Sequence, residues 1–262
     1  MSTTIWQFSG KTALVSGGAT GIGEATVRKL VTAGAAVVFS DLNEAAGAAL
    51  ERELLGGGGD VRFVVSDATD EPQVAALVAN AVSLSGRLDV AINNVGGIAR
   101  YAGDHSKIRL AETSLEAWRA TVDLNLTSCF LGMKHQIPAM VATSGGAIVN
   151  LTSLAGMNYS DSASPAYAAA KAAVIHLTRY AAIRHATDHV RVNVVAPGLT
   201  ATKAMLANMP DEEVRKMRAA RLPMNRMIDP AEIADACLWA CSDAASGVTG
   251  MTIPVDGGTA AL

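Results

Sequence analysis

The stretch Ser16-Gly17-Gly18-Ala19-Thr20-Gly21-Ile22-Gly23 follows the apolar run Thr12–Ser16 and leads directly into a segment with helical spacing. Strand, glycine-rich turn and helix in this order are typical of a dinucleotide-binding unit, because the helix N-terminus offers amides and partial positive charge to a pyrophosphate. The spacing differs from G-x-G-x-x-G, so a plain glycine-rich turn is the alternative. The residues expected to contact a cofactor here are Gly17, Thr20, Gly21, Ile22 and Gly23.

Apolar runs suited to buried strands alternate with helical segments along the whole chain. Seven strands are predicted, at Thr12–Ser16, Ala36–Ser40, Val61–Ser66, Leu88–Asn93, Ala147–Leu151, Val190–Ala196 and Met251–Val255. Helices are predicted at Gly23–Ala33, Glu44–Leu55, Pro72–Leu84, Leu115–Met140, Ala166–Ala186 and Pro230–Cys241. The alternation predicts an α/β fold in one domain of residues 1–262, a doubly wound Rossmann-type parallel sheet with helices on both faces. Ligands of such a sheet bind beyond the carboxyl ends of its strands.

Charge and composition narrow the classes of partner. The net charge is −3 and the 21 basic residues are scattered, so neither nucleic acid nor a membrane surface is an expected partner. No apolar run reaches the roughly 18 residues of a membrane span, and residues 1–10 lack a signal-peptide pattern, so we expect a cytoplasmic protein. The three cysteines are predicted to be free buried thiols. His185 and His189 could share a helix face, but no third ligand is evident and no metal is expected.

Asp41 bears on the choice of cofactor. It closes the second strand about twenty residues after the glycine turn, where a carboxylate accepts hydrogen bonds from ribose hydroxyls and repels a 2′-phosphate. No Arg or Lys lies within residues 17–24 to bind that phosphate, so NAD is predicted over NADP. Capping of the next helix is the alternative role of Asp41. Leu42 beside it is expected to contact the cofactor too.

Residues after the third and fourth strands complete the predicted cofactor contacts. Asp67, followed by Ala68, could bind the adenine amino group or cap the next helix. The fourth strand ends in Asn93-Asn94-Val95-Gly96, where a small backbone could approach a cofactor closely. We therefore expect contacts from Asn94, Val95 and Gly96.

Tyr167 and Lys171 are four residues apart in a helical segment, so their side chains share one face. An ammonium close to a phenol, together with a positive nicotinamide, favours the phenolate and would lower its pKa from about 10. Ser153 follows the fifth strand and could hold a substrate oxygen beside the phenol. Asn125 could orient a water for proton relay. Taken singly, Tyr167 and Lys171 could be structural, Ser153 a cap and Asn125 a helix surface residue.

These motifs, in this order, resemble the short-chain dehydrogenase/reductase family over nearly the whole chain. The glycine turn is similar to its cofactor loop, residues 93–96 to its Asn-Asn-Ala-Gly stretch with Val95 in place of Ala, and residues 255–258 to its C-terminal strand. Pro197 and Gly198, with Thr200 and Thr202, resemble the segment that binds the nicotinamide carboxamide. The resemblance implies a catalytic tetrad, made of Asn125, Ser153, Tyr167 and Lys171.

The resemblance also implies what the tetrad does. Tyr167 would exchange a proton with the substrate oxygen while hydride moves at the same carbon, and Lys171 would lower the phenol pKa and bind the nicotinamide ribose. Ser153 would orient the carbonyl, and Asn125 would hold a water linking Lys171 to solvent. Family members are commonly homotetramers, and the alanines at positions 168, 169, 172 and 173 would allow close helix approach.

Two long loops at the carboxyl edge are expected to carry function, at residues 96–112 and 198–228. The second contains five methionines and predicts either a lid over an apolar substrate or the packing of two short helices. In the first, Arg100, His105, Lys107 and Arg109 could meet an anion or form a solvated loop.

The predicted function is an NAD-dependent dehydrogenase of a small, largely apolar secondary alcohol or ketone. Three rivals are an NADP-dependent carbonyl reductase, a non-catalytic NAD-binding regulator and a methyltransferase. A regulator would not need the tetrad, and a methyltransferase would need neither Tyr167 nor Lys171.

Overall fold

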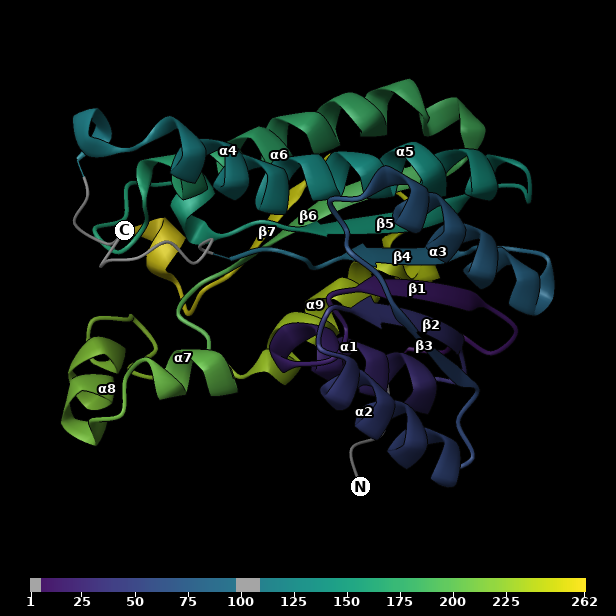
Figure 1. Cartoon of the computed structure of the whole chain (residues 1–262), viewed down its shortest axis with the longest axis horizontal. Coiled ribbons are helices and arrows are strands. Elements are labelled where there is room, and N and C mark those ends of the chain that lie inside the picture. The colour runs from purple at the N-terminus through teal and green to yellow at the C-terminus, as the bar shows by residue number, and fades with distance from the viewer. Residues whose placement is uncertain (1–5, 98–108) are drawn as a thin grey trace.

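The computed structural model describes residues 6–97 and 109–262, and its centre is a sheet of seven parallel strands (Figure 1). The strands run in the order β3-β2-β1-β4-β5-β6-β7. The predicted doubly wound sheet is therefore confirmed, and the strand order reverses between β1 and β4, where such folds bind their ligands. The strands are β1 (Thr12–Ser16), β2 (Ala36–Asp41), β3 (Val61–Val65), β4 (Val90–Asn93), β5 (Gly146–Leu151), β6 (Val190–Pro197) and β7 (Thr252–Val255).

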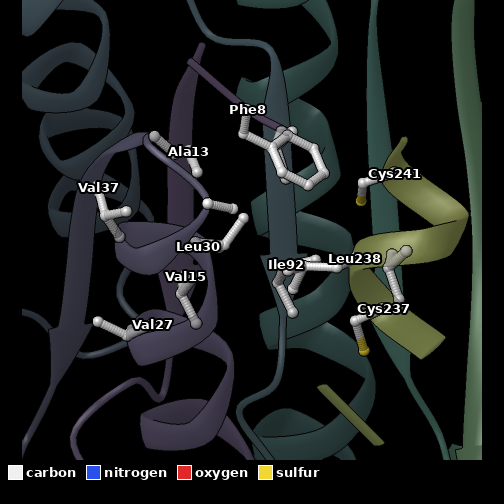
Figure 2. Packing of buried hydrophobic residues seen from close by; sticks show 14 of the residues in the cluster. Phe8, Ala13, Val15, Val27, Leu30, Val37, Ile92, Cys237, Leu238 and Cys241 are labelled. Carbon is white, nitrogen blue, oxygen red and sulfur yellow. The ribbon is translucent and has the colours of Figure 1, made fainter. Parts of the chain in front are cut away.

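Helices cover both faces of this sheet, as the long apolar strands require. One face packs on α1 (Gly21–Thr32), α2 (Glu44–Gly56) and α9 (Pro230–Cys241), and the other on α3 (Glu71–Ser85), α5 (Ser128–Val141) and α6 (Pro165–Arg184). Figure 2 shows part of the first core, in which Val15 and Ile92 of the sheet belong to one cluster with Leu30 of α1 and Leu238 of α9. Alternate residues of each strand fill the two cores, which fixes the sheet rigidly beneath its carboxyl edge.

The predicted helix Leu115–Met140 is interrupted. It consists of α4 (Leu115–Val122), a π-helical turn at Asp123–Thr127 and α5. Such a turn holds one extra residue and shifts the face that the following side chains present, and π-turns often occur at functional sites. Here the turn carries Asn125, which is 1% exposed. The alternative of a helix surface residue is wrong.

The segment 198–228 leaves the sheet after β6 and returns to it. It forms α7 (Lys203–Ala207) and α8 (Glu212–Ala219), and Ala201 N donates to Ile228 O at 2.8 Å where its two ends meet. Met209 is buried, whereas Met217 and Met224 are more than half exposed. The two short helices are thus present, and exposed methionines remain on their surface. Across the described ranges, no helix is both long and apolar enough to traverse a bilayer.

Candidate active site

Glycines shape the cofactor side of the carboxyl edge. Gly17 has φ +68° and Gly21 φ +59°, which L-residues adopt rarely. Gly23 is required for space: a Cβ there would lie 1.9 Å from Gly17 O. The same carbonyl accepts a hydrogen bond from Asn94 Nδ2 at 2.7 Å, so the end of β4 is tied to the glycine turn. Val95 packs on the turn as well, since a Cβ at Gly17 would lie 3.1 Å from its Cγ2.

Asp41 stands at the carboxyl end of β2, beside this turn. Its Oδ2 accepts from Ala19 N at 3.1 Å and its Oδ1 from Asn43 N at 3.0 Å, so the carboxylate also fixes the glycine turn. The N-cap of α2 is Asn43, whose side chain accepts from Ala46 N. The capping alternative for Asp41 is therefore wrong. Leu42 next to it is 66% exposed, on the surface that a bound adenosine would meet.

Asp67 is likewise not a helix cap. The N-cap of α3 is Asp70, which accepts from Gln73 N at 3.0 Å. Asp67 Oδ1 instead accepts from the amide and the hydroxyl of Thr69, which curls the chain around the partly buried Ala68. The second carboxylate oxygen of Asp67 has no hydrogen-bond partner among the described residues, and it is free to accept from a ligand.

The segment after β6 closes the other side of the glycine turn. Thr202 contacts Gly21, because a Cβ there would lie 3.3 Å from Thr202 Cγ2. The Thr202 hydroxyl accepts from Met205 N at 3.1 Å and so begins α7. Thr200 Oγ1 donates to Gly198 O at 3.0 Å, which keeps the chain after Pro197 compact. Segments from β1, β4 and β6 thus converge at the point where the strand order reverses.

The four tetrad candidates come from three elements and gather at this edge. Ser153 follows β5, Tyr167 and Lys171 lie in α6, and Asn125 lies in the π-helical turn. Ser164 caps α6 and Pro165 occupies its first turn, so the helix begins just before Tyr167. Lys171 Nζ lies 5.7 Å from the centre of the Tyr167 ring, which confirms the shared face.

Ser153 serves two partners. Its Oγ accepts from Ala155 N at 3.2 Å and caps the short 3-10 helix η4 (Leu154–Gly156), as the capping alternative predicts. The hydroxyl also makes a hydrogen bond with the Tyr167 phenol, which acts to lower the pKa of Tyr167. A hydrogen bond that lowers the pKa of the phenol stabilises the phenolate, so the Ser153 hydroxyl is the donor and the Tyr167 oxygen the acceptor.

Burial nevertheless raises the pKa of Tyr167 above its usual value of 10.0, and this outweighs the effect of Ser153. The expectation that Lys171 makes the phenol acidic is thus not met by the protein by itself. The physical reason is desolvation, which disfavours the phenolate. A positive ligand group next to the phenol would have to supply the missing stabilisation.

Lys171 is 3% exposed, and burial lowers its pKa from 10.5 to about 8. The ammonium donates to Leu151 O at 3.0 Å. The Cys129 thiol interacts with it electrostatically, and burial raises the pKa of that thiol to about 12. A lysine of this kind changes protonation state near neutral pH, unlike an exposed lysine.

Asn125 is held by the chain that follows β4. Its Oδ1 accepts from Gly97 N at 2.9 Å, and its Nδ2 donates to Gly97 O at 2.7 Å and to Thr121 O at 2.9 Å. Both amide protons are therefore used, and one Oδ1 lone pair remains for a water. Gly96 fits between the two polar residues, since a Cβ there would lie 2.6 Å from Lys171 Nζ and 2.7 Å from Asn125 Oδ1.

A buried amide network beneath the site was not predicted. Asn93 Nδ2 donates to Asn150 Oδ1 at 2.8 Å, Asn93 exchanges two hydrogen bonds with Gln136, and Asn150 Nδ2 donates to Thr178 Oγ1 at 2.8 Å. It joins β4, β5, α5 and α6. The sequence did contain one signal for this network: Asn93 and Asn150 each lie in an otherwise apolar strand, and the two strands pair at these positions.

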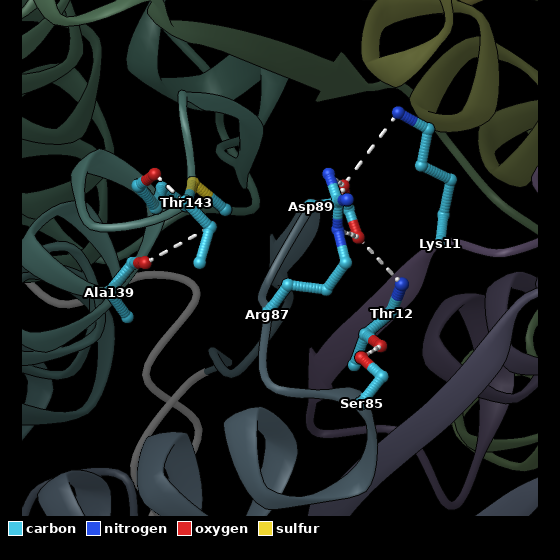
Figure 3. Close-up of polar contacts among 8 residues, drawn as sticks. Lys11, Thr12, Ser85, Arg87, Asp89, Ala139 and Thr143 are labelled. Atoms are coloured by element: carbon cyan, nitrogen blue, oxygen red, sulfur yellow. Dashed lines mark hydrogen bonds and ion pairs between the residues drawn. The ribbon is translucent and has the colours of Figure 1, made fainter.

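The opposite edge of the sheet contains a polar cavity of about 240 Å³, lined in part by the residues of Figure 3. Asp89 accepts from Thr12 N at 2.9 Å and from Arg87 Nε at 2.9 Å, and Lys11 Nζ lies 3.7 Å from it. Arg191 donates to Ala240 O at 2.6 Å, near the end of α9. The charges here join strand starts to helix ends, and the cavity lies far from the converging glycines.

Two further predictions concern His185 with His189 and the charged residues of the loop 96–112. Helix α6 ends at Arg184, and His189 lies beyond it with φ +59°. His185 and His189 therefore do not share a helix face, contrary to the arrangement considered from their spacing. His185 Nδ1 instead pairs with Asp188 at 2.9 Å. No metal-binding group of three side chains occurs in the part of the chain that the structure describes. Arg100, His105 and Lys107 lie outside the described residues.

Comparison with known proteins agrees with this geometry. A family model described as Enoyl-(Acyl carrier protein) reductase matches residues 17–260. A solved short-chain type dehydrogenase/reductase from Mycobacterium ulcerans superimposes with a TM-score of 0.90 at 34% identity, covering 97% of this chain and 91% of that chain. The chain belongs to the short-chain dehydrogenase/reductase family.

Two further relatives of this short-chain dehydrogenase/reductase have named substrates. The cis-4-hydroxycyclohexanecarboxylate dehydrogenase of Sinomonas cyclohexanicum is 42% identical over 255 residues, which are 97% of this chain and 98% of the relative. A solved 7α-hydroxysteroid dehydrogenase complexed with NADH and 7-oxo glycochenodeoxycholic acid has a TM-score of 0.87 at 32% identity, covering 98% and 97% of the two chains. The predicted reaction class, secondary-alcohol oxidoreduction, is confirmed.

The short-chain dehydrogenase/reductase site fits the nicotinamide dinucleotide that the family uses. A side chain at Gly23 would collide with Gly17 O and one at Gly96 with Lys171 Nζ, so the backbone at these two positions is left bare. The start of α1 has no side-chain cap, because the Thr20 hydroxyl accepts no hydrogen bond from it. Its first amides are therefore available to a pyrophosphate.

Proposed function

We propose that this chain is an NAD-dependent dehydrogenase that interconverts a cyclic, largely apolar secondary alcohol and its ketone, as a single unit of residues 1–262. The observation that carries the proposal is the buried Lys171, one helical turn from a Tyr167 phenol that hydrogen-bonds Ser153, beside the glycine turn.

Each tetrad residue has a task that follows from its contacts. Tyr167 takes the proton of the substrate hydroxyl during oxidation and returns it during reduction, and Ser153 orients the same oxygen. When bound, the nicotinamide ring supplies the hydride exchange and, in its oxidised form, the positive charge that favours the phenolate. Lys171, with a pKa of about 8, can pass a proton toward solvent and hold the cofactor ribose. Asn125 holds the loop after β4 and keeps one lone pair for a relay water.

The residues proposed to bind the cofactor surround the glycine turn. Asp41 and Leu42 would meet the adenosine ribose, Asp67 and Ala68 the adenine, and the α1 N-terminus the pyrophosphate. The nicotinamide end would meet Asn94, Val95 and Gly96, the segment of Pro197, Gly198, Thr200 and Thr202, and the tetrad pair Tyr167 and Lys171.

NAD is proposed over NADP because of Asp41. Its carboxylate is fixed by Ala19 N and Asn43 N, so it cannot turn away from a 2′-phosphate without breaking these bonds. The NADH in the hydroxysteroid dehydrogenase complex is consistent with this proposal.

A ring alcohol is proposed as substrate because the dehydrogenase from Sinomonas cyclohexanicum and the hydroxysteroid dehydrogenase are named for ring compounds, a cyclohexane and a steroid. The exposed Met157, after Ser153, and Met224, in the segment 198–228, offer adaptable apolar surface on this side of the molecule. Comparing cyclohexanol with cis-4-hydroxycyclohexanecarboxylate as substrates tests whether a carboxylate on the ring contributes to binding.

The test is turnover followed at the nicotinamide absorbance. We expect oxidation of cyclohexanol or cis-4-hydroxycyclohexanecarboxylate with NAD to exceed reduction of a 3-oxoacyl thioester. Tyr167→Phe should lower kcat by about 10² to 10⁴-fold, the range of a lost general acid/base. NAD affinity, measured by protein fluorescence, is the control and should change little. Robust turnover by Tyr167→Phe would overturn the proposed proton transfer.

We also propose a cytosolic homotetramer. The buried free thiols of Cys129, Cys237 and Cys241 suit a reducing compartment. On α5 and α6, the outward side chains of Phe130, Tyr180 and Ile183 are 45%, 62% and 78% exposed, which is typical of helices that pack against another subunit. Light scattering at micromolar concentration tests this, and a monomeric mass contradicts it.

A further inference from the structure

The segment that carries Ser153 is hydrogen-bonded to both the backbone carbonyl and the side-chain ammonium of Lys171. Thr152 N donates to Val195 O at 2.9 Å, which fixes Thr152 to β6. Its hydroxyl donates to Lys171 O at 2.7 Å, in a buried contact between the sheet and α6. From the other end of the same residue, Lys171 Nζ donates to Leu151 O at 3.0 Å.

Gly156 lies against the backbone of the same helix, α6. It is the last residue of η4, and its amide donates to Ser153 O at 2.9 Å. A Cβ at this position would lie 2.6 Å from Lys171 C and 2.9 Å from Ala172 N, so the two backbones are in direct contact. Its φ lies outside the left-handed region. Glycine is therefore needed here for space and not for backbone conformation.

These contacts fix the Lys171 backbone one helical turn from Tyr167. Tyr167 lies one turn before Lys171, and a helix is stiff over one turn, so the height and rotation of the Lys171 carbonyl set the position of the Tyr167 side chain. We infer that Thr152 and Gly156 are positioning residues, which set the Ser153–Tyr167 hydrogen bond by fixing the backbone of Lys171. The inference rests on the proposed function, in which that hydrogen bond belongs to the proton path.

The inferred role predicts a change in pH dependence as well as in rate. A longer Ser153–Tyr167 contact removes an interaction that favours the phenolate, so the ionisation of Tyr167 moves to higher pH. Among the described residues, the ionisable groups closest to this pair are Lys171 on α6 and, beside Lys171, Cys129 on α5, and both side chains are kept in the variants at positions 152 and 156.

The experiment compares two Thr→Val substitutions, each of which removes one hydroxyl from the contact between the sheet and α6. Thr152→Val removes the hydroxyl that binds Lys171 O and is expected to lower kcat by about 10 to 100-fold, since a misplacement near 1 Å costs about that much. The KM for NAD should change less than twofold. The pH profile of kcat should move to alkaline pH, and Thr152→Ser should restore both rate and profile.

Thr178→Val is the matched control. Like Thr152, Thr178 is a buried threonine whose hydroxyl bonds across the contact between the sheet and α6: it lies on α6 and accepts from Asn150 Nδ2 of β5 at 2.8 Å. It sits about two turns beyond Lys171, away from the phenol. We expect it to lower thermal stability as Thr152→Val does, while leaving the pH profile unchanged.

Equal losses of kcat with unshifted profiles in the Thr152→Val and Thr178→Val variants would overturn the inference. If Thr152→Val does not fold, Gly156→Ala takes its place: its added methyl should push α6 away and shift the profile in the same direction, and an unshifted profile would again overturn it. Tyr167 ionisation can also be read from ultraviolet difference spectra against Tyr167→Phe. That measurement stands even if no alcohol is turned over, so failure of the proposed function and failure of the inference are distinguishable.

Discussion

The two halves of the sheet prepare one site by opposite means. Around β1, the nucleotide side depends on missing side chains: Gly23 lies directly against Gly17 O, and Gly17 and Gly21 have positive φ angles. Around β4 and β5, the catalytic side is built by burying polar atoms: Asn125 and Lys171 are both almost fully enclosed. The first half should therefore be sensitive to added atoms, and the second to the loss or gain of a charge or hydrogen bond.

The largest expected effect comes from adding one methyl group to the nucleotide side. Gly23→Ala places a Cβ 1.9 Å from Gly17 O, a backbone atom that cannot move without opening the turn. We expect a stability loss of about 1 to 3 kcal/mol or more, as for overpacked cores. NAD affinity, measured by calorimetry, should fall about 100-fold, because the turn then no longer presents its amides correctly.

Gly56→Ala is the control for this substitution. Gly56 ends α2, its φ is not in the left-handed region, and a Cβ there meets nothing within 4 Å. Alanine is favoured over glycine in a helix by about 0.5 to 1 kcal/mol, so this variant should be slightly more stable and bind NAD normally. Similar NAD binding by the two variants would show that the turn does not depend on the missing side chain.

On the catalytic side, a substitution should increase stability while it lowers activity, whereas Gly23→Ala lowers both stability and NAD binding. Lys171→Met removes a buried charge, and the lowering of its pKa from 10.5 to about 8 corresponds to roughly 3 kcal/mol of destabilisation at neutral pH. The lost hydrogen bond to Leu151 O offsets about 1 kcal/mol of this. We expect the free energy of unfolding of the variant at pH 7 to be about 2 kcal/mol higher than that of the wild-type protein, and its turnover to be low.

The pH dependence of that gain identifies its cause. Between about pH 8 and 10.5, the unfolded chain keeps a proton on Lys171 that the folded chain has released. The stability of the wild-type protein therefore rises with pH in this window relative to the variant, and is unaffected by this group below it. Urea unfolding at several pH values should show the difference shrinking from pH 8 upward. A constant difference would mean that packing, and not charge, separates the two proteins.

The same contrast explains what the sequence could and could not predict. Glycines between a strand and a helix identify a backbone turn directly, and Asp41 at a strand end follows from the same pattern. The π-helical turn that buries Asn125 leaves no periodic signal, because it adds a single residue to an otherwise regular helix. The raised pKa of Tyr167 also escaped prediction, since burial depends on elements far apart in the chain.

Hydrogen bonds across the sheet were equally hidden. Gln136 reads as an ordinary residue of a helix, yet it is 2% exposed and bound to Asn93 on β4. The partners of a buried amide are set by which strands become neighbours, and β4 pairs with β5 only through the crossover formed by α4 and α5. Spacing along the chain predicts which residues are candidates for catalysis, while the tertiary fold determines which groups they contact.

The smallest expected effect separates shape from charge on the nucleotide side. Asp41→Asn keeps an oxygen for Ala19 N or Asn43 N and removes the negative charge, whereas Asp41→Ala removes both. If charge decides the choice of cofactor, Asp41→Asn should already improve kcat/KM with NADP about tenfold, near 1.4 kcal/mol, while NAD use falls only slightly. Asp41→Ala should in addition weaken NAD binding by roughly tenfold, because the turn loses both its anchors. Unchanged selectivity in both variants would mean that the NAD preference, if present, arises elsewhere, and the proposal for Asp41 would be wrong.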